Sequence, residues 1–204
     1  EGFSDNLTAN QVRLLASLTN LRSLNLSTNP EITADVLRCL PTNVHYFGLD
    51  SQKTPFDVAM CASLPRGPHT LRVTTTIGED VSETELAAAF PPQLKGLQGF
   101  SYPNPSTAFF EHLPHSLTSL ELDTNHLEAL AGLGTGCPQL QTLEISSEAK
   151  TADWTFWRSL PKSLRSFTLR LSNRDNEGNV VNEPIKVLPE DIALLPRHLR
   201  YLSF

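Results

Sequence analysis

The chain has 204 residues, of which 39% are hydrophobic, enough to bury the core of one large domain or two small ones. Its formal net charge is −6, and its 16 basic residues form no run of Lys or Arg, which argues against nucleic acid and anionic membranes as partners. No stretch approaches the roughly 20 apolar residues that a membrane-spanning helix needs, so we expect no membrane insertion.

One phrase of apolar residues recurs along the chain at near-constant spacing. Its fullest copies follow the pattern LxxLxL at residues 21–29 and 117–127, where the pattern continues into Asn29 and Asn125. The first positions of the copies fall at 21, 44, 68, 94, 117, 140, 164 and 199. The steps between them are 23, 24, 26, 23, 23, 24 and 35 residues, and all but the last are typical of a solenoid repeat.

A second phrase, an apolar residue followed by Pro, precedes most of these copies. It closes short segments that carry apolar residues at helical spacing, and it occurs at residues 40–41, 64–65, 90–91, 113–114, 137–138, 160–161 and 195–196. Proline cannot continue a helix and disfavours helix for the residue before it. We therefore expect each repeat to pair a short strand with a short helix or 3-10 turn.

The strand phrase has a physical reason to repeat. Alternate Leu side chains of LxxLxL point to one face of the strand, and no single coil can bury that face. The repeats resemble the leucine-rich repeat family over nearly all of residues 7–204, and their LPxxLxxLxL form is similar to Leu-Pro repeats of protist and fungal proteins. The resemblance implies an α/β solenoid, with a curved parallel sheet on its concave side and short helices or 3-10 turns on its convex side.

Two local features of the repeats need the structure to decide them. Near residues 94–102 the strand starts either at Leu94, which keeps the period even, or at Leu97, which places Phe100 and Tyr102 in the apolar positions; packing favours Leu97. The Asn that ends the phrase, as at Asn125, is expected to turn the chain inward and bond the exposed backbone of a neighbouring coil.

The concave surface that the resemblance implies is the expected partner-binding face. Glu121, Asp123 and Glu144 fall at outward positions of neighbouring strands, about 5 Å apart, and form an acidic patch suited to a basic segment of a partner protein. The alternative is ordinary solvated surface on an acidic protein. The candidate partner-binding residues are Tyr46, Arg72, Glu121, Asp123, Glu144 and Arg170.

The longest step between repeats marks an insertion. Residues 172–184 are polar and rich in turn-forming residues, and insertions in solenoids project as loops that often carry binding. We expect residues 1–204 to form one leucine-rich repeat domain of about eight coils within a longer array. On that expectation, further repeats, another domain or a partner chain cover the end coils, because an uncapped end shows its apolar face to water.

No catalytic motif accompanies the repeats. The chain has no GxSxG, P-loop, GxGxxG or HExxH pattern, and its six His are scattered over several coils. We therefore expect no enzyme, cofactor or metal site, and favour a protein-binding module that uses the concave face or the inserted loop. The alternatives are an architectural segment or a substrate-recognition arm of a larger protein. Cys39, Cys61 and Cys137 are expected to be unpaired core thiols, which leans towards an intracellular compartment.

Overall fold

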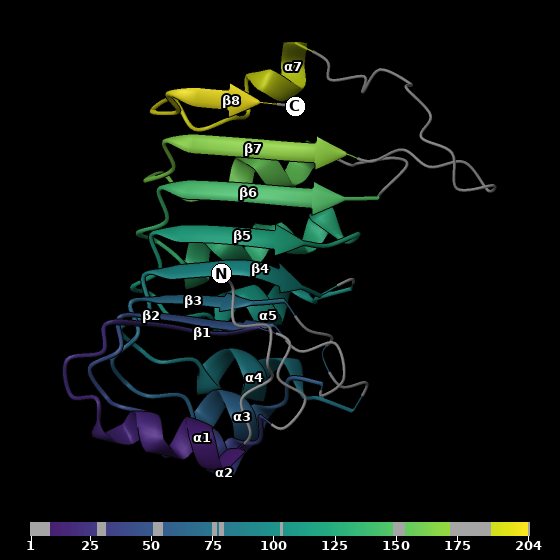
Figure 1. Cartoon of the computed structure of the whole chain (residues 1–204). Helices are drawn as coiled ribbons and strands as arrows, with labels where there is room; N and C mark the ends of the chain where they lie inside the picture. The colour runs from purple at the N-terminus through teal and green to yellow at the C-terminus, as the bar shows by residue number, and fades with distance from the viewer. Residues whose placement is uncertain are drawn as a thin grey trace.

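Among the residues that the computed structural model describes, eight strands form one parallel sheet in sequential order (Figure 1). The structure describes residues 9–27, 32–50, 55–74, 77, 80–102, 104–148, 154–171 and 189–203. The strands are β1 (Ser23–Ser27), β2 (Tyr46–Asp50), β3 (Thr70–Val73), β4 (Gly96–Ser101), β5 (Ser119–Asp123), β6 (Thr142–Ser147), β7 (Ser166–Leu171) and β8 (Tyr201–Ser203).

Short helices and 3-10 turns connect the strands and stack behind the sheet, on its convex side (Figure 1). The α-helices are α1 (Ala9–Leu14), α2 (Ala34–Leu37), α3 (Val58–Ala62), α4 (Glu83–Ala89), α5 (Thr107–Glu111), α6 (Leu133–Gly136) and α7 (Pro189–Ile192). The 3-10 turns are η1 (Leu15–Ser17), η2 (Leu127–Gly132) and η3 (Trp154–Ser159). The expected α/β solenoid with a curved parallel sheet is therefore confirmed.

The strands alternate as the repeat phrase predicts. In β5, Leu120 and Leu122 are buried and the intervening Glu121 is exposed. Neighbouring strands stay in step, since Leu120 pairs with Leu143 and Leu122 with Ile145 on β6. Each coil thus adds one layer to a continuous core, and its outward side chains form rows across the sheet.

The Leu-Pro phrase builds the corner that leads into each strand. The carbonyl of Pro114 accepts a 3.0 Å hydrogen bond from the N–H of Leu117, and Pro161 and Pro196 make the same contact with the Leu three residues later. Because proline ends the preceding helix and this turn reverses the chain, the first Leu of each of these repeats arrives at an equivalent place. The corners are therefore near copies of one another.

A bulge in β4 resolves the uncertain register at residues 94–102. Leu94 is buried at the first position of its repeat, so the even period is correct and the preferred start at Leu97 is wrong. The pairing with β5 shifts between Leu97 and Phe100, and Gly99 between them has a φ of 63°. This left-handed residue accommodates the extra position and places Phe100 opposite Leu122.

Aromatic side chains fill the core in two stretches of the array. Phe90 and Phe109 lie on either side of Phe100, each with its ring centroid 5.8 Å from that of Phe100. Further along, Trp157 packs edge-on against Phe167 with ring centroids 6.4 Å apart. The first group joins α4, β4 and α5, so it ties two consecutive coils together in the middle of the array.

Other expectations meet the structure in different ways. Cys61 and Cys137 are buried free thiols, whereas Cys39 is half-buried and therefore not a core residue. Asn29 and the insertion at 172–184 lie outside the described residues. In the part of the chain that is described, no helix combines the length and the apolar character needed to cross a membrane.

Candidate functional site on the concave sheet

The outward side chains of β5, β6 and β7 form an ionic cluster on the concave face. Glu121 lies directly opposite Glu144 on the next strand, and Asp123 lies opposite Ser146, which is opposite Arg170. Neighbouring strands are about 4.8 Å apart, so these side chains share one patch. The structure thus brings together four of the six predicted residues, which we call the β5–β7 cluster: Glu121, Asp123, Glu144 and Arg170.

Arg170 changes the charge of this cluster. Its guanidinium forms an ion pair with the Glu144 carboxylate across the strand boundary. Glu144 is half-buried and Arg170 is exposed, so the pair fixes one carboxylate and neutralises part of the patch. Glu121 and Asp123 are exposed and form no ion pair among the described residues, and they supply the accessible negative charge.

The carboxyl group of Asp123 is partly desolvated, although the residue is exposed. Partial desolvation raises the pKa of its carboxyl, and the negative charge of Glu148 raises it further. Glu148 follows β6, and its N–H donates a 2.8 Å hydrogen bond to the side-chain oxygen of Asn125. This bond holds Glu148 beside the end of β5, so the negative patch extends past the ends of the strands.

Sequence reasoning missed Glu148 as a member of this patch. A signal was available, because Asn125 and Glu148 are 23 residues apart, which is one repeat, and the Asn was expected to bond a neighbouring coil. That expectation is correct for Asn125. Its amide is exposed, however, and the neighbouring Thr124 is the buried polar residue.

Tyr46 and Arg72 lie apart from the cluster. Tyr46 is half-buried at the start of β2, opposite Ser23, and Arg72 is exposed in the middle of β3, opposite Gly48 and Gln98. Strand β4 separates Arg72 from β5. The two residues therefore belong to the same concave face but not to one compact site.

Hydrogen bonds connect the edge of the concave face beside Asp123 to the coil before it. The Glu83 carboxylate accepts hydrogen bonds from the Ser106 N–H, at 2.9 Å, and from the Ser106 hydroxyl. Burial, followed by the charge and hydrogen bond of Glu83, raises the pKa of Tyr102 to about 12. The Tyr102 N–H donates to the carbonyl of Asp123, so these contacts fix the end of β5.

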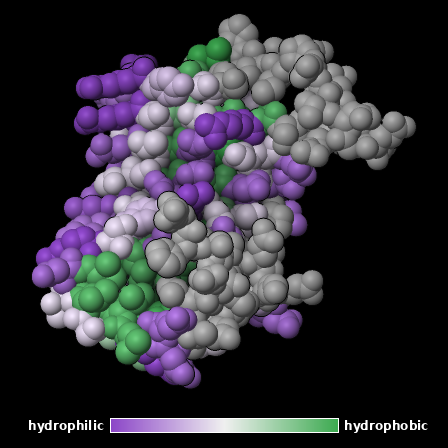
Figure 2. Space-filling view, viewed as in Figure 1, coloured by the Kyte–Doolittle hydropathy of each residue, from purple (hydrophilic) through white to green (hydrophobic). Residues whose placement is uncertain are grey.

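The described residues contain no group of His, Cys, Asp and Glu arranged to hold a metal ion. Among them the β5–β7 cluster combines fixed carboxylates with open access to solvent. Figure 2 shows that the surface over these strands is mostly hydrophilic to neutral. Such a surface can meet a complementary charged segment without burying an unpaired charge.

The fold has known counterparts among solved structures. The leucine-rich repeat-containing protein LegL7 from Legionella pneumophila matches 82% of this chain over 61% of its own, with 17% sequence identity and a TM-score of 0.51. Internalin C2 from Listeria monocytogenes matches 99% of this chain over 78% of its own, with 21% identity and a TM-score of 0.56. The chain thus spans less than two thirds of the LegL7 chain.

No protein-family model matches the sequence, and no curated protein resembles it. The comparison of structures nevertheless establishes the architecture, because both neighbours share it over most of this chain. The chain has the leucine-rich repeat fold, as the repeat phrase indicated.

Proposed function

We propose that this chain is a protein-binding module that receives a basic segment of its partner on the concave sheet, at the β5–β7 cluster. The observation that carries the proposal is the placement of Glu121 and Asp123, two exposed carboxylates on one strand, beside the fixed Glu144–Arg170 pair. The backbone under them is an uninterrupted ladder, so the charges are held in place before a partner arrives.

The solenoid supports this role because rigid strands present the side chains in rows. A basic segment lying across β5 and β6 would meet Glu121 and Asp123 and be steered by the negative charge of Glu148. Arg170 would repel a basic segment on the β7 side. Such a segment would therefore lie over β5 and β6 rather than over β7. The chemistry required is binding alone, and no turnover is proposed.

The experiment compares capture of partners from the source cell by three forms of the chain. A triple charge reversal, Glu121→Lys, Asp123→Lys and Glu144→Lys, is expected to fold like the parent and to lose the partner. The matched control reverses three carboxylates on the convex side: Glu85→Lys, Glu111→Lys and Glu128→Lys. Equal loss from both variants, or retention by the concave variant, would place the binding site elsewhere.

A second candidate role is architectural, with contacts made by the ends of the array. Leu14 is 71% exposed and Leu18 48% exposed in the first coil, and Ile192 is 47% exposed in the last. We propose that further repeats, another domain or a partner chain cover such surfaces. Substituting Leu14→Ser and Ile192→Ser would then abolish association while the concave variant leaves it intact.

A further inference from the structure

The edge at which the strands begin carries a column of basic side chains. The N–H of the residue just before each strand region donates to the carbonyl of its equivalent one coil earlier, at 2.7–2.9 Å, through all eight coils. Two members of this column are neutral, Thr118 and Gln141. The others are Arg22, His45, His69, Lys95, Arg165 and Arg200.

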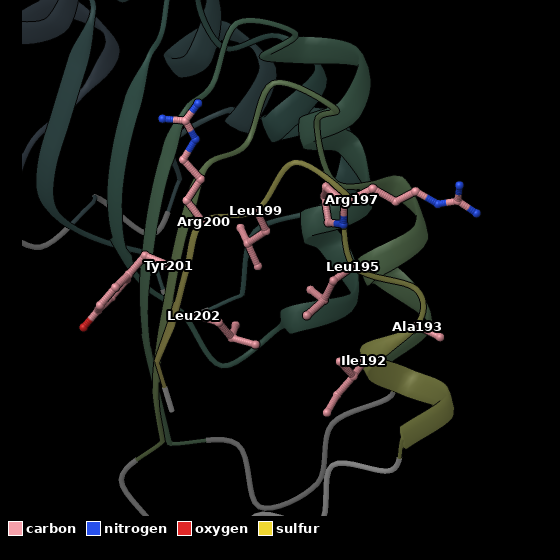
Figure 3. A pocket seen from close by; sticks show the side chains of 9 residues that line it. Ile192, Ala193, Leu195, Arg197, Leu199, Arg200, Tyr201 and Leu202 are labelled. Carbon is pink, nitrogen blue, oxygen red and sulfur yellow. The ribbon is translucent and has the colours of Figure 1, made fainter.

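A second column runs beside the first, at the residue that follows the corner proline. Its basic members are Arg66, His115, Lys162 and Arg197. The left side of Figure 2, where the strands of Figure 1 begin, shows hydrophilic side chains projecting along this edge. In the last coil, Arg197 and Arg200 both point away from the apolar interior that Leu199 and Leu202 occupy, Arg200 on the strand side of the corner and Arg197 on the helix side (Figure 3). We call the two columns together the basic edge.

The basic edge contains no carboxylate. The chain segments that carry the two columns hold seven of the 16 Lys and Arg and, with His198 between the columns, four of the six His. These segments are residues 20–23, 41–46, 65–70, 91–96, 114–119, 138–142, 161–166 and 196–201. An even spread would put about five of the 22 acidic residues there. The rest of the chain holds nine basic and all 22 acidic residues, a formal charge of −13. The repeat period therefore brings these basic side chains together on one edge, although they form no run in the sequence.

These cations have no ionic partners among the described residues. The ion pairs formed by arginines there join Arg38 to Asp35 and Arg170 to Glu144, both away from this edge. Every basic side chain of the edge is exposed, and Arg22 donates to the carbonyl of Asn43 at 3.2 Å. Away from the edge, Arg38 and Arg170 are paired, whereas Arg13, Arg72 and Arg158 are exposed and form no ion pair among the described residues. The edge is therefore distinguished by its lack of carboxylates rather than by unpaired cations alone.

The stacking of these residues costs stability. Arg165 and Arg200 lie on adjacent coils, with the N–H of Arg200 2.7 Å from the carbonyl of Arg165. Like charges at neighbouring ladder positions repel each other. A bound anion relieves this repulsion, which gives the arrangement a use that ordinary solvated surface lacks.

We propose that the basic edge binds an acidic, extended segment of a protein partner, on a surface distinct from the concave sheet. Seven steps between coils of about 4.8 Å span about 34 Å, which an extended chain covers with about ten residues. In the fifth coil, exposed carboxylates border the edge on both sides: Glu121 lies in β5 two residues after Ser119, and Glu111 lies at the end of α5 three residues before Pro114. A bilayer or a nucleic-acid duplex is wider and meets the flanking negative charge, whereas a single peptide strand meets the edge alone.

The test uses a fluorescein-labelled decapeptide of Glu, with a Gln decapeptide as the neutral control, in fluorescence anisotropy at low and physiological salt. The Glu peptide is expected to bind, and its affinity to fall as salt rises, because the contact is ionic. Arg165→Glu with Arg200→Glu is expected to weaken binding at least about tenfold, and Arg22→Glu with Lys95→Glu to do the same at the other half of the edge.

The matched control has the same charge change away from the edge: Arg13→Glu in α1 with Arg38→Glu just after α2, both exposed on the convex side. It is expected to leave the affinity within about twofold, and circular dichroism confirms that all variants fold. Equal weakening by the control, or binding of the Gln peptide, overturns the proposal. So does edge-dependent binding of phosphatidylserine vesicles or a DNA duplex in the absence of Glu-peptide binding.

The concave face is tested separately in the same assay. The triple variant of Glu121, Asp123 and Glu144 is expected to bind the Glu peptide as well as the parent or better, since it removes negative charge. If that variant loses its cellular partner but keeps the peptide, both proposals stand. If the peptide binds and no partner depends on the concave face, the proposed function fails and the basic edge stands.

Discussion

The side-chain oxygen of Asn125 accepts a 2.8 Å hydrogen bond from the backbone N–H of Glu148, which lies 23 residues later and therefore one coil further along. This bond joins the turn after β5 to the end of β6, where the pattern of strand pairing stops. It also positions Glu148 beside Asp123, so a structural contact sets the electrostatics of the candidate site.

Replacing this amide tests its contribution to the fold. Asn125→Ala is expected to lower the free energy of unfolding by about 1 kcal/mol, because the hydrogen bond is lost but the exposed Glu148 N–H regains water. Urea denaturation measures the change. Gln141→Ala, which shortens an exposed amide on the neighbouring coil, serves as the control and is expected to have little effect.

The core register is tested by a buried charge. Leu122 is 1% exposed between Phe100 and Ile145, so Leu122→Asp should cost several kcal/mol and unfold at least the neighbouring coils. Thr142→Asp adds the same charge at an exposed position of β6 and should leave the melting temperature nearly unchanged. Similar melting of both variants would show that the register is wrong.

The bulge in β4 depends on the absence of a side chain at Gly99. Its left-handed φ costs any other residue about 1–2 kcal/mol, and a Cβ there would also lie 2.8 Å from Cγ2 of Thr74. Gly99→Ala should therefore destabilise the protein in urea. Adding Thr74→Ser removes the clashing methyl and should recover part of the loss, while the backbone cost remains. Full recovery would contradict the backbone argument.

Asp123 makes stability depend on pH in a defined direction. Its folded-state pKa is raised, so the folded protein holds the proton more tightly than the unfolded chain, whose Asp titrates near about 3.9. The contribution to stability is full below that value and is lost as pH rises through the folded pKa. Asp123→Asn should thus stabilise the protein at neutral pH and lose this advantage in acid. Glu148→Gln, which removes the second cause of the shift, should reduce the effect.

The three thiols should differ in reactivity. Burial raises the pKa of Cys61 well above its ordinary value and that of Cys137 to about 12, so neither forms much thiolate in the native state. Cys39 is half-buried and is expected to react first with iodoacetamide, as mass spectrometry of the native protein would show. In denaturant all three should react at similar rates. Early labelling of Cys137 would indicate that its coil opens.

The sequence predicted the fold because its signal is periodic. Leu24, Leu120 and Leu143 repeat at fixed intervals, and such spacing specifies strand, direction and stacking at once. The rows of the concave face followed from the same register, so the adjacency of Glu121 and Glu144 was predictable.

What escaped prediction depends on departures from the period and on contacts between side chains. The bulge at Gly99 shifts the pairing of the second half of β4 by one position. A count of apolar residues could not show where in the strand this bulge lies. The pairing of Arg170 with Glu144 depends on rotamers rather than on spacing. The basic edge follows the period, since residues such as Arg22 and Arg200 hold the same position in different repeats, but it was missed because only runs of adjacent Lys and Arg were considered.

The aromatic contacts around Phe100 bear on how the molecule opens. In a linear array each coil is held chiefly by its two neighbours, so the interior coils lose two interfaces on opening and the terminal coils only one. With Phe90 and Phe109 each packed against Phe100, amide hydrogen exchange should be slowest around β4, and faster in α1 and α7, where Leu14 and Ile192 are exposed. A ligand spanning the full edge would couple these two weakly packed segments through the more tightly packed coils between them.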